Sequence, residues 1–562
     1  MHGFFERHQA LLQRAVQAIA ERGYWSPFSE MPSPRVYGET AADEGKAAFE
    51  ARLNKNFPVP APLPGAAAAV YTGDEISPFG FKLGVRYPTA DLDALLHRVA
   101  AAAVDWRRAG PEVWAGVSLE ILDRLNKRSF EMAHAVMHTT GQAFMMAFQA
   151  GGPHAQDRAL EAIAAAWDEI GRIPKTADWE KPQGKNAPLK MRKTYRIVPR
   201  GIGLVIGCST FPTWNGYPGL FADLATGNAV VVKPHPSAIL PLAITVEIAR
   251  DVLAEAGFDP DIVSLAAHPA GDTTATALAL HPAIRLIDFT GSSANGNWLE
   301  RNALQASVFT EKSGVNQIVI DSTADFKGMI RNIAFSLVLY SGQMCTAPQN
   351  IYIPKDGIDT PEGHVGFDGV VAALAEGIDK LTGDPAKAVE LLGAIQNTAV
   401  LDRIKAARKL GETALDSRPL AHPIFPDARV HTPLLVKIGA ADAASMPSIP
   451  MTQEFFGPIS FAIATGSTAD SIAIAERTAR EHGAITLSAY TTDAAVKEQL
   501  REAAATAGVA LSLNLTGAVF VNQSAAFSDY HGTGANPSAN AALTDAAFIA
   551  SRFRIVQTRE HQ

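Results

Sequence analysis

Short apolar runs alternate with helical stretches in the middle of the chain, and this alternation restricts the fold more than any other feature. Runs at 201–206 and 229–232 have the character of buried strands, and runs at 262–265 and 285–289 repeat it after a helix expected at 238–256. Strands joined by helices of this length pair in parallel through right-handed crossovers. The sequence therefore predicts a doubly wound α/β sheet.

The rest of the chain adds further units to this sheet. Its 562 residues exceed the size at which one hydrophobic core stops growing, so several packed units are expected. Residues 92–167 have helical periodicity, and a second alternating set runs from 317 to 490. A last strand is expected at 553–556. These patterns predict a helical layer and a second α/β unit.

Charge and cysteine content argue against several classes of protein. A net charge of -8 and a pI near 6.0 are poorly suited to a nucleic acid partner. No run of about 18 apolar residues exists, so no membrane span is expected, and residues 1–25 lack the uninterrupted core of a signal peptide. The two cysteines, Cys208 and Cys345, fit a reducing compartment, so we expect a cytoplasmic protein.

Cys345 and Glu311 are the candidates for chemistry. Cys345 lies among small residues at what we expect to be the start of a helix, where backbone N–H groups would favour its thiolate. A carboxylate such as Glu311, placed near a thiol, can take a proton from water and drive thioester hydrolysis. Taken singly, the cysteine could equally be a buried packing residue and the glutamate a surface residue.

Two further segments have features of a nucleotide site. The turn at 289–292, with Gly291 and Ser292, follows a strand and opens a helix, whose N-terminus attracts phosphate. Lys233 ends another strand, where its ammonium could reach a ribose. Each has an ordinary alternative, a simple turn for the first and a solvated lysine for the second.

Other reactive residues have more ordinary interpretations. His134 and His138 share a helix face, but neither an intervening glutamate nor a third ligand accompanies them, so we interpret them as structural and expect no metal site. Cys208 ends a buried strand, where packing is the favoured interpretation and a pocket-lining thiol the alternative.

Five segments in a fixed order make the chain similar to the aldehyde dehydrogenase superfamily, from about residue 100 to the C-terminus. They are GNAVVVKP (227–234), FTGS (289–292), Glu311 with Gly314, GQMC (342–345) and EFFGP (454–458). The resemblance implies an α/β fold with a Rossmann-type cofactor domain, an α/β catalytic domain and a small β oligomerisation arm. It also implies a homodimer or a dimer of dimers.

The resemblance assigns domains and roles. The domains it implies are an N-terminal extension (1–80), an NAD(P)-binding domain (81–182 and 201–310), a catalytic domain (311–530) and an arm (183–200 and 540–562). The roles it implies are nucleophile for Cys345, general base for Glu311, ribose contacts for Lys233 and Glu454, a pyrophosphate site at Gly291 and Ser292, and nicotinamide packing for Phe456.

Two positions depart from the family pattern. Thr210 stands where the family has an asparagine amide that helps to hold the oxyanion; its hydroxyl can donate one hydrogen bond, and Asn215 lies close by in sequence. After Lys233, His235 and Pro236 replace a frequent acidic residue that binds the ribose 2′-hydroxyl. Because a 2′-phosphate would meet no like charge there, NADP is expected to bind at least as well as NAD.

Within the family, the N-terminal FFERH (4–8) and the segment 529–537 look like those of a phenylacetic acid degradation subfamily. That resemblance implies a small-molecule aldehyde from aromatic catabolism, with the semialdehyde of a ring-opened CoA thioester as a candidate. Two alternatives stay open. One is CoA-acylating release, which Glu311 disfavours; the other is a non-catalytic relative that binds a ring-cleavage enzyme, which Thr210 favours.

Overall fold

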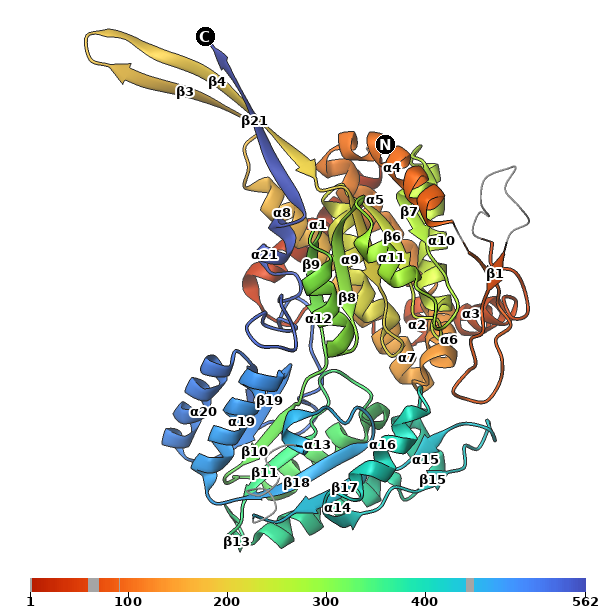
Figure 1. The fold of residues 1–562 in the computed structure, drawn as a ribbon, viewed down its shortest axis with the longest axis vertical. Helices are drawn as coiled ribbons and strands as arrows, with labels where there is room; N and C mark the ends of the chain where they lie inside the picture. The colour runs from red at the N-terminus through yellow and green to blue at the C-terminus, as the bar shows by residue number, and fades with distance from the viewer. Residues whose placement is uncertain (1–2, 59–69, 90, 441–448) are drawn as a thin grey trace.

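The computed structural model describes residues 3–58, 70–89, 91–440 and 449–562, which form two packed units and a projecting arm (Figure 1). The first unit holds a five-stranded sheet in the order β7-β6-β5-β8-β9, with every neighbouring pair parallel. Its strands are β5 (Ile202–Ile206), β6 (Ala229–Lys233), β7 (Val263–Leu265), β8 (Ile284–Thr290) and β9 (Ser307–Glu311). Four of the five were predicted from the apolar runs, within one residue at each end. We call this part the five-stranded unit.

The helices between these strands follow the predicted alternation. They are α9 (Pro212–Ala225), α10 (Leu240–Glu255), α11 (Thr274–Leu280) and α12 (Ser293–Asn302). Helix α9 begins at Pro212, which occupies its first turn, where the missing N–H is not needed. The parallel strands therefore all direct their carboxyl ends to the same edge of the sheet.

A helical layer and the N-terminal segment cover this sheet. The layer comprises α4 (Leu92–Ala109), α5 (Pro111–Lys127), α6 (Ser129–Thr140), α7 (Phe144–Gly151) and α8 (Pro153–Gly171). Helix α1 (Gly3–Glu21) packs on α5 and α8 through a buried apolar stripe that includes Leu12, Ala15 and Ala18. The N-terminal segment is thus part of the packed core.

Glu75 joins the N-terminal segment to the five-stranded unit. Its buried carboxylate accepts the backbone N–H groups of Ile239 and Leu240, at the start of α10, and the hydroxyl of Tyr87. Burial raises the pKa of Glu75 to about 7, although these three donors oppose the rise. A carboxylate at a helix N-terminus stabilises the helix through its unpaired N–H groups.

The second unit holds a seven-stranded sheet in the order β14-β17-β18-β11-β10-β19-β20, and we call it the seven-stranded unit. Its strands are β10 (Gln317–Ile320), β11 (Asn350–Pro354), β14 (Glu412–Leu415), β17 (Leu434–Ile438), β18 (Ile459–Thr465), β19 (Thr486–Tyr490) and β20 (Ala510–Leu513). Only the edge strand β14 is antiparallel. The predicted second α/β unit is present, and β20 extends it beyond residue 490. After β20 the chain returns to the five-stranded unit (Figure 1).

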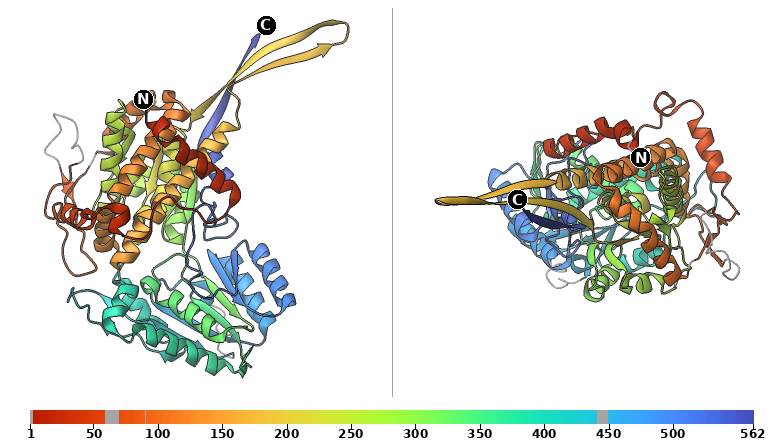
Figure 2. Two further views of the ribbon diagram at one scale, coloured as in Figure 1. Left: turned by 180° about the vertical axis from the view of Figure 1, so that it is seen from behind. Right: turned by 90° about the horizontal axis from the view of Figure 1, so that it is seen from above.

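A three-stranded antiparallel arm projects from the five-stranded unit (Figures 1 and 2). It consists of β3 (Thr176–Gln183), β4 (Asn186–Pro199) and β21 (Phe553–His561), in the order β21-β4-β3. The sequence assignment started the arm at 183 and 540. The structure differs because the hairpin turn lies at Gly184, with a φ of 61°, so that β3 precedes it. Residues 546–550 form α21, which packs on α8 instead of joining the arm.

Arg552 fixes the chain at the base of the arm. Its fully buried guanidinium pairs with Asp223 of α9 at 2.7 Å and with Asp288 of β8 at 2.6 Å. Removing one partner of such a buried pair leaves an uncompensated charge, which typically costs about 3–5 kcal/mol.

No helix in the described residues is long and apolar enough to cross a membrane.

Candidate active site

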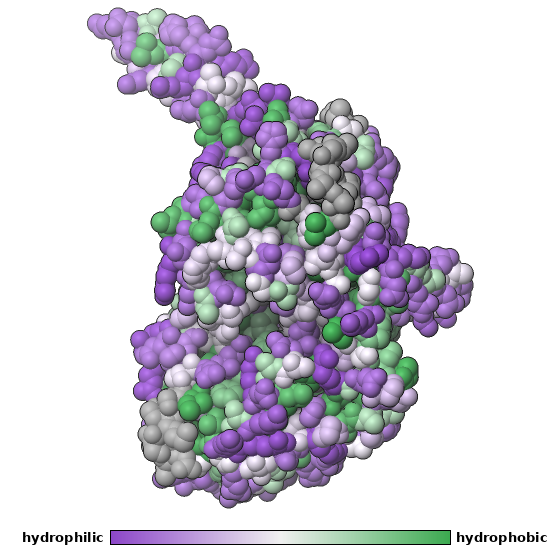
Figure 3. All heavy atoms as spheres, turned by 45° about the vertical axis from the view of Figure 1, so that its right-hand side comes forward, coloured by the Kyte–Doolittle hydropathy of each residue, from purple (hydrophilic) through white to green (hydrophobic). Residues whose placement is uncertain are grey.

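A cavity of about 760 Å³ lies between the two units, and Figure 3 shows a hollow on the surface there. All eight sequence-predicted site residues line it: Thr210, Lys233, Gly291, Ser292, Glu311, Cys345, Glu454 and Phe456. The cavity is at the carboxyl edge of the five-stranded sheet, where ligands of open α/β sheets bind. The structure thus brings together segments that lie as far apart as residues 210 and 456.

Cys345 is presented by an unusual backbone. The helix α13 (Phe326–Val338) is followed by a short 3₁₀ turn, η2 (Leu339–Gly342), in which Tyr340, Ser341 and Gly342 all have positive φ. A Cβ at Gly342 would lie 2.3 Å from the carbonyl oxygen of Gly457, so only glycine fits. Such strained backbone persists where surrounding contacts over-determine it, and it clusters at functional sites.

The expected helix start at Cys345 is wrong. The residue lies in a turn after η2, and no helix begins there, so no helix dipole favours its thiolate. Instead, the carbonyl oxygen of Cys345 accepts a 2.6 Å hydrogen bond from Asn316 Nδ2. Burial, followed by the negative charge of Glu311, raises the pKa of the Cys345 thiol well above its usual value. Ionisation of this thiol therefore needs a nearby base.

Glu311 ends β9 and faces the thiol. Its side chain is almost fully buried, and Asn215 Nδ2 donates a 3.0 Å hydrogen bond to its Oε2. Burial alone would raise the pKa of Glu311, but the charge of His531 and hydrogen bonds with His531, Cys345 and Asn215 outweigh it and lower that pKa below its usual value. The side chain is therefore held as a carboxylate beside Cys345.

His531 is the residue that the sequence interpretation missed. Its Nε2 lies 3.1 Å from Glu311 Oε1 and 3.7 Å from Cys345 Sγ, and only 3% of the residue is exposed. The segment 529–537 had served only as a mark of the subfamily. A histidine within a glycine-rich stretch was the one available signal, because no spacing connects it to residues 311 or 345.

The donor atoms of Glu311, Cys345 and His531 all lie within 4.8 Å of one another, so a thiol, an imidazole and a carboxylate meet in one buried group. By contrast, His134 and His138 stack on Phe49, in line with their structural interpretation. Burial lowers the pKa of His134 to about 4 and that of His138 to about 3.

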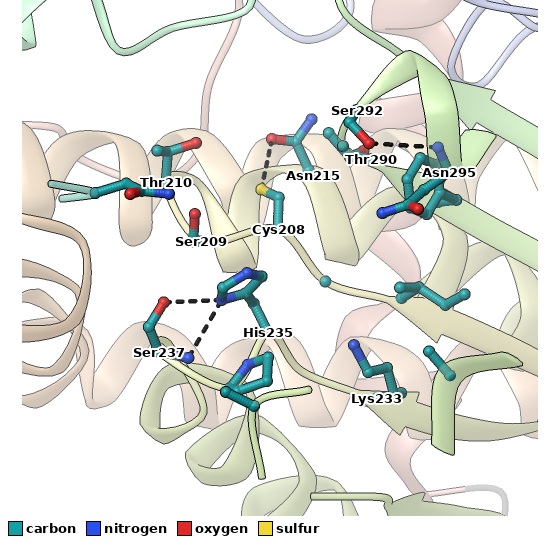
Figure 4. A pocket seen from close by; sticks show the side chains of 18 of the residues that line it. Cys208, Ser209, Thr210, Asn215, Lys233, His235, Ser237, Thr290, Ser292 and Asn295 are labelled. Carbon is teal, nitrogen blue, oxygen red and sulfur yellow. Dashed lines mark hydrogen bonds between the residues drawn. The ribbon is translucent and has the colours of Figure 1, made fainter. Parts of the chain in front are cut away.

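Asn215, in the first turn of α9, places its side-chain amide in the cavity. It contacts Glu311 through Nδ2, and its Oδ1 lies 3.6 Å from Cys208 Sγ (Figure 4). Cys208 therefore lines the cavity, where burial raises the pKa of its thiol. Thr210 also lines the cavity, and its carbonyl oxygen accepts a 2.8 Å hydrogen bond from Gln142 Nε2.

Lys233 and Ser292 line another part of the cavity. Lys233 ends β6 and is 5% exposed, and its ammonium has no hydrogen-bond or ion-pair partner among the described residues. Burial lowers the pKa of its ammonium to about 8, so a bound anion would stabilise its charge. Ser292 caps α12, whose first N–H groups open beside Gly291. A dinucleotide with its anionic pyrophosphate fits these residues.

Residues of the seven-stranded unit also line the cavity. Glu454 Oε1 accepts a long hydrogen bond of 3.4 Å from the backbone N–H of Gly314, and burial raises the pKa of Glu454 to about 7. Phe456 lies beside it on the cavity wall, and its carbonyl oxygen accepts a hydrogen bond from Arg403. Two distant parts of the chain thus share one cavity.

Two carboxylates, Asp74 and Asp272, line the same cavity as Lys233 and His235. The expectation for NADP rests on the residues after β6, where no acid stands, and a carboxylate delivered by a loop is its alternative. Asp74 comes from the N-terminal segment and Asp272 from the loop after β7. Loops that fold back from other segments can therefore supply the acid that the strand end lacks.

Comparison with known proteins agrees with this arrangement. The sequence profile of the aldehyde dehydrogenase family matches residues 84–524. A solved structure of an NAD-dependent aldehyde dehydrogenase from Burkholderia multivorans is 64% identical, with a TM-score of 0.97, and the match covers 100% of this chain and 99% of that one.

Two curated relatives are semialdehyde dehydrogenases. An N-succinylglutamate 5-semialdehyde dehydrogenase of Chromobacterium violaceum is 27% identical over 69% of this chain and 74% of its own length. A 2-aminomuconic 6-semialdehyde dehydrogenase of a Pseudomonas species is 27% identical over 64% of this chain and 68% of its own length. By its matching profile, its fold and its cavity, this chain belongs to the aldehyde dehydrogenase family.

Proposed function

We propose that the protein oxidises an aldehyde to a carboxylic acid with NAD(P), through a thioester on Cys345 that is hydrolysed with Glu311 as base. The observation that carries this proposal is the meeting of Cys345 and Glu311 in a cavity that is also lined by residues suited to a dinucleotide. We call the part lined by Lys233, Gly291 and Ser292 the cofactor end. The part lined by Glu311, Cys345 and His531 is the thiol end.

The reaction begins at the thiol end. The thiolate of Cys345 adds to the aldehyde carbon, and the new oxyanion needs a donor, for which the Thr210 hydroxyl and the Asn215 amide are the candidates. When bound, the nicotinamide accepts the hydride that leaves this carbon. Lys233 and Glu454 would hold its riboses, Gly291 and Ser292 its pyrophosphate, and Phe456 would pack on its ring.

Hydrolysis then releases the acid. Glu311 takes a proton from water, the hydroxyl oxygen bonds to the thioester carbon, and the bond from that carbon to Cys345 Sγ breaks. The thiolate leaves with the electron pair. A carboxylate held beside the sulfur supports hydrolysis over transfer of the acyl group to CoA, and over a non-catalytic role.

For the substrate, we propose a semialdehyde from aromatic catabolism. The subfamily resemblance supports phenylacetate breakdown, and two relatives act on semialdehydes by name. A CoA-linked semialdehyde is the finer candidate. We place the enzyme in the cytoplasm as a homodimer or a dimer of dimers, because the exposed edges β3 and β21 of the arm suit pairing with another subunit.

The direct test follows the formation of reduced nicotinamide by absorbance, with NAD or NADP and a panel of simple and CoA-linked semialdehydes. Mass spectrometry then distinguishes a free acid from an acyl-CoA product when CoA is added. Turnover that yields free acid supports the proposal. Turnover that requires CoA would contradict hydrolysis, and the absence of turnover with every aldehyde and both cofactors would contradict the proposed function.

A further inference from the structure

His531 contacts both groups that the proposed function needs, yet the mechanism above gives it no task. One atom, Nε2, lies 3.1 Å from Glu311 Oε1 and 3.7 Å from Cys345 Sγ. Oε1 accepts no hydrogen bond from the described residues, and the imidazole of His531 lies directly against it. The imidazole therefore stands where a proton could pass between sulfur and carboxylate.

A buried network holds the segment that carries this histidine. The guanidinium of Arg158, on α8, is fully buried and donates to the carbonyl oxygen of Asp529 at 3.0 Å and to Ser524 Oγ at 2.6 Å. Glu161 pairs with Arg158 at 2.8 Å and accepts the backbone N–H of Phe527 at 2.9 Å. Residues 524–529 are thus anchored by charge-assisted bonds that would be costly to break.

Aromatic contacts then fix the ring itself. The edge of the Trp214 ring meets the His531 ring, with 4.6 Å between centroids, and the guanidinium of Arg158 lies over Trp214. The guanidinium of Arg22 lies 3.9 Å from the ring centre of the neighbouring Tyr530. The Trp214 contact and the anchored segment hold the imidazole near Cys345, which is how a reactive group is preorganised.

The thiol needs such a neighbour. It is buried beside a carboxylate, and no helix N-terminus, lysine or arginine contacts it among the described residues. The second thiol of the cavity, Cys208, donates its hydrogen bond to Asn215 Oδ1. A protonated thiol is a poor nucleophile. A base that becomes positive as the sulfur becomes negative would stabilise the thiolate.

We propose that His531 is a catalytic residue, which accepts the proton of the Cys345 thiol to give a thiolate–imidazolium pair supported by Glu311. The inference rests on the proposed function. The proton leaves Sγ and arrives at Nε2, and no other bond changes. The 3.1 Å contact between Nε2 and Oε1 suits the charged product, in which the N–H of the imidazolium donates to the carboxylate. Glu311 stays a carboxylate, ready for the later attack by water.

The test measures alkylation of Cys345 by iodoacetamide as a function of pH, with peptide mass spectrometry to separate Cys345 from Cys208. It requires neither aldehyde nor cofactor. In His531→Gln the side-chain amide can still donate to Glu311 but cannot accept a proton. We expect its alkylation rate at pH 7 to fall at least about ten-fold, and the pH at which the rate rises to move upward.

Two further variants separate proton transfer from structure. His531→Asn shortens the side chain and removes the contact with Glu311, so it should lose the same reactivity even if Gln cannot be accommodated. Tyr530→Phe keeps the ring under Arg22 in the same segment and is expected to react like the wild type. Melting temperatures show whether each variant folds.

The outcomes are separable. If both folded His531 variants are alkylated with the wild-type rate and pH profile, His531 is not the proton acceptor. If the wild-type protein oxidises no aldehyde, the proposed function fails, whatever the alkylation shows. Loss of reactivity in Tyr530→Phe as well would contradict the proposal, because it would assign the effect to packing of the segment.

Discussion

At the cofactor end, Lys233 ends β6 and Gly291 follows β8, two strands of one parallel sheet. At the thiol end, Glu311, Cys345 and His531 come from three separate parts of the chain. The cofactor end depends on the regular succession of strand, turn and helix. The thiol end depends on how the five-stranded unit, the strained turn after α13 and the returning segment 524–531 pack together. The cofactor end is thus formed by successive elements of one sheet, and the thiol end by segments that are distant in sequence.

This difference teaches where single changes should matter most. A change at the cofactor end removes one of several contacts to a large ligand, so its effect should be graded. A change at the thiol end removes a group that acts as a unit with its neighbours, and such groups are strongly non-additive. The four predictions below test that contrast in order of decreasing effect.

The largest effect is expected for Cys345→Ala. Because only the nucleophile is lost, aldehyde oxidation should fall by at least about 10⁴-fold, while the melting temperature and cofactor binding stay close to those of the wild type. Steady-state rates with the best aldehyde measure it. Cys208→Ala removes the other thiol of the cavity and serves as the matched control, with a cost mainly in stability. Comparable turnover in Cys345→Ala would end the assignment of the nucleophile.

Glu311→Gln should have the next largest effect. Deacylation needs an activated water but hydride transfer does not, so kcat should fall by about 10²–10⁴-fold and an acyl-enzyme should accumulate on Cys345. Mass spectrometry after one turnover would detect the added mass. If free acid still forms at the wild-type rate, the base is another residue, and Glu311 is not part of the catalytic group at the thiol end.

Away from the cavity, at the start of α10, Glu75→Gln should change stability with a defined pH dependence. The folded-state pKa of Glu75, about 7, lies above the ordinary value of 4.5, so ionisation favours unfolding. The stability that the protonated carboxyl confers is fully present below pH 4.5 and is lost as pH rises to about 7. The neutral amide avoids this loss and should make the protein more stable at pH 8, by about 3 kcal/mol, with little difference at pH 4.5. Denaturant unfolding at the two pH values decides it, and an equal effect at both would contradict it.

The smallest effect is expected for cofactor choice. In Pro236→Glu, a carboxylate added after β6 should weaken NADP binding about ten-fold, or about 1.4 kcal/mol, and leave NAD binding less affected. Titration of wild-type and variant protein with each cofactor measures this. NADP is expected to bind the wild-type protein at least as well as NAD, but the acids Asp74 and Asp272 line the same cavity. Asp272→Asn is the matched variant, and it should raise NADP affinity if that acid faces the 2′ position. Clearly tighter binding of NAD by the wild type, abolished in Asp272→Asn, would favour the loop acid.

The sequence by itself determined the parts of this protein that local order controls. The period of its apolar residues located β5, β6, β7 and β8, because side-chain alternation and helix spacing reflect neighbours only a few residues away. Five short motifs, recognised by resemblance, also located seven of the eight candidate site residues that line the cavity, and the eighth, Thr210, was located as a departure from the family pattern.

Only the tertiary structure decided what depends on distant segments. It placed Cys345 in a strained turn instead of at a helix start, set His531 between Cys345 and Glu311, and brought Asp74 and Asp272 to the cofactor end. None of these follows from a local pattern, because residues separated by 186 positions, such as Cys345 and His531, interact only after two units and a returning segment have packed. The physical reason is that a residue's backbone conformation depends on neighbours a few positions away in sequence. Side-chain contacts in the packed protein, by contrast, can join residues at any separation in sequence.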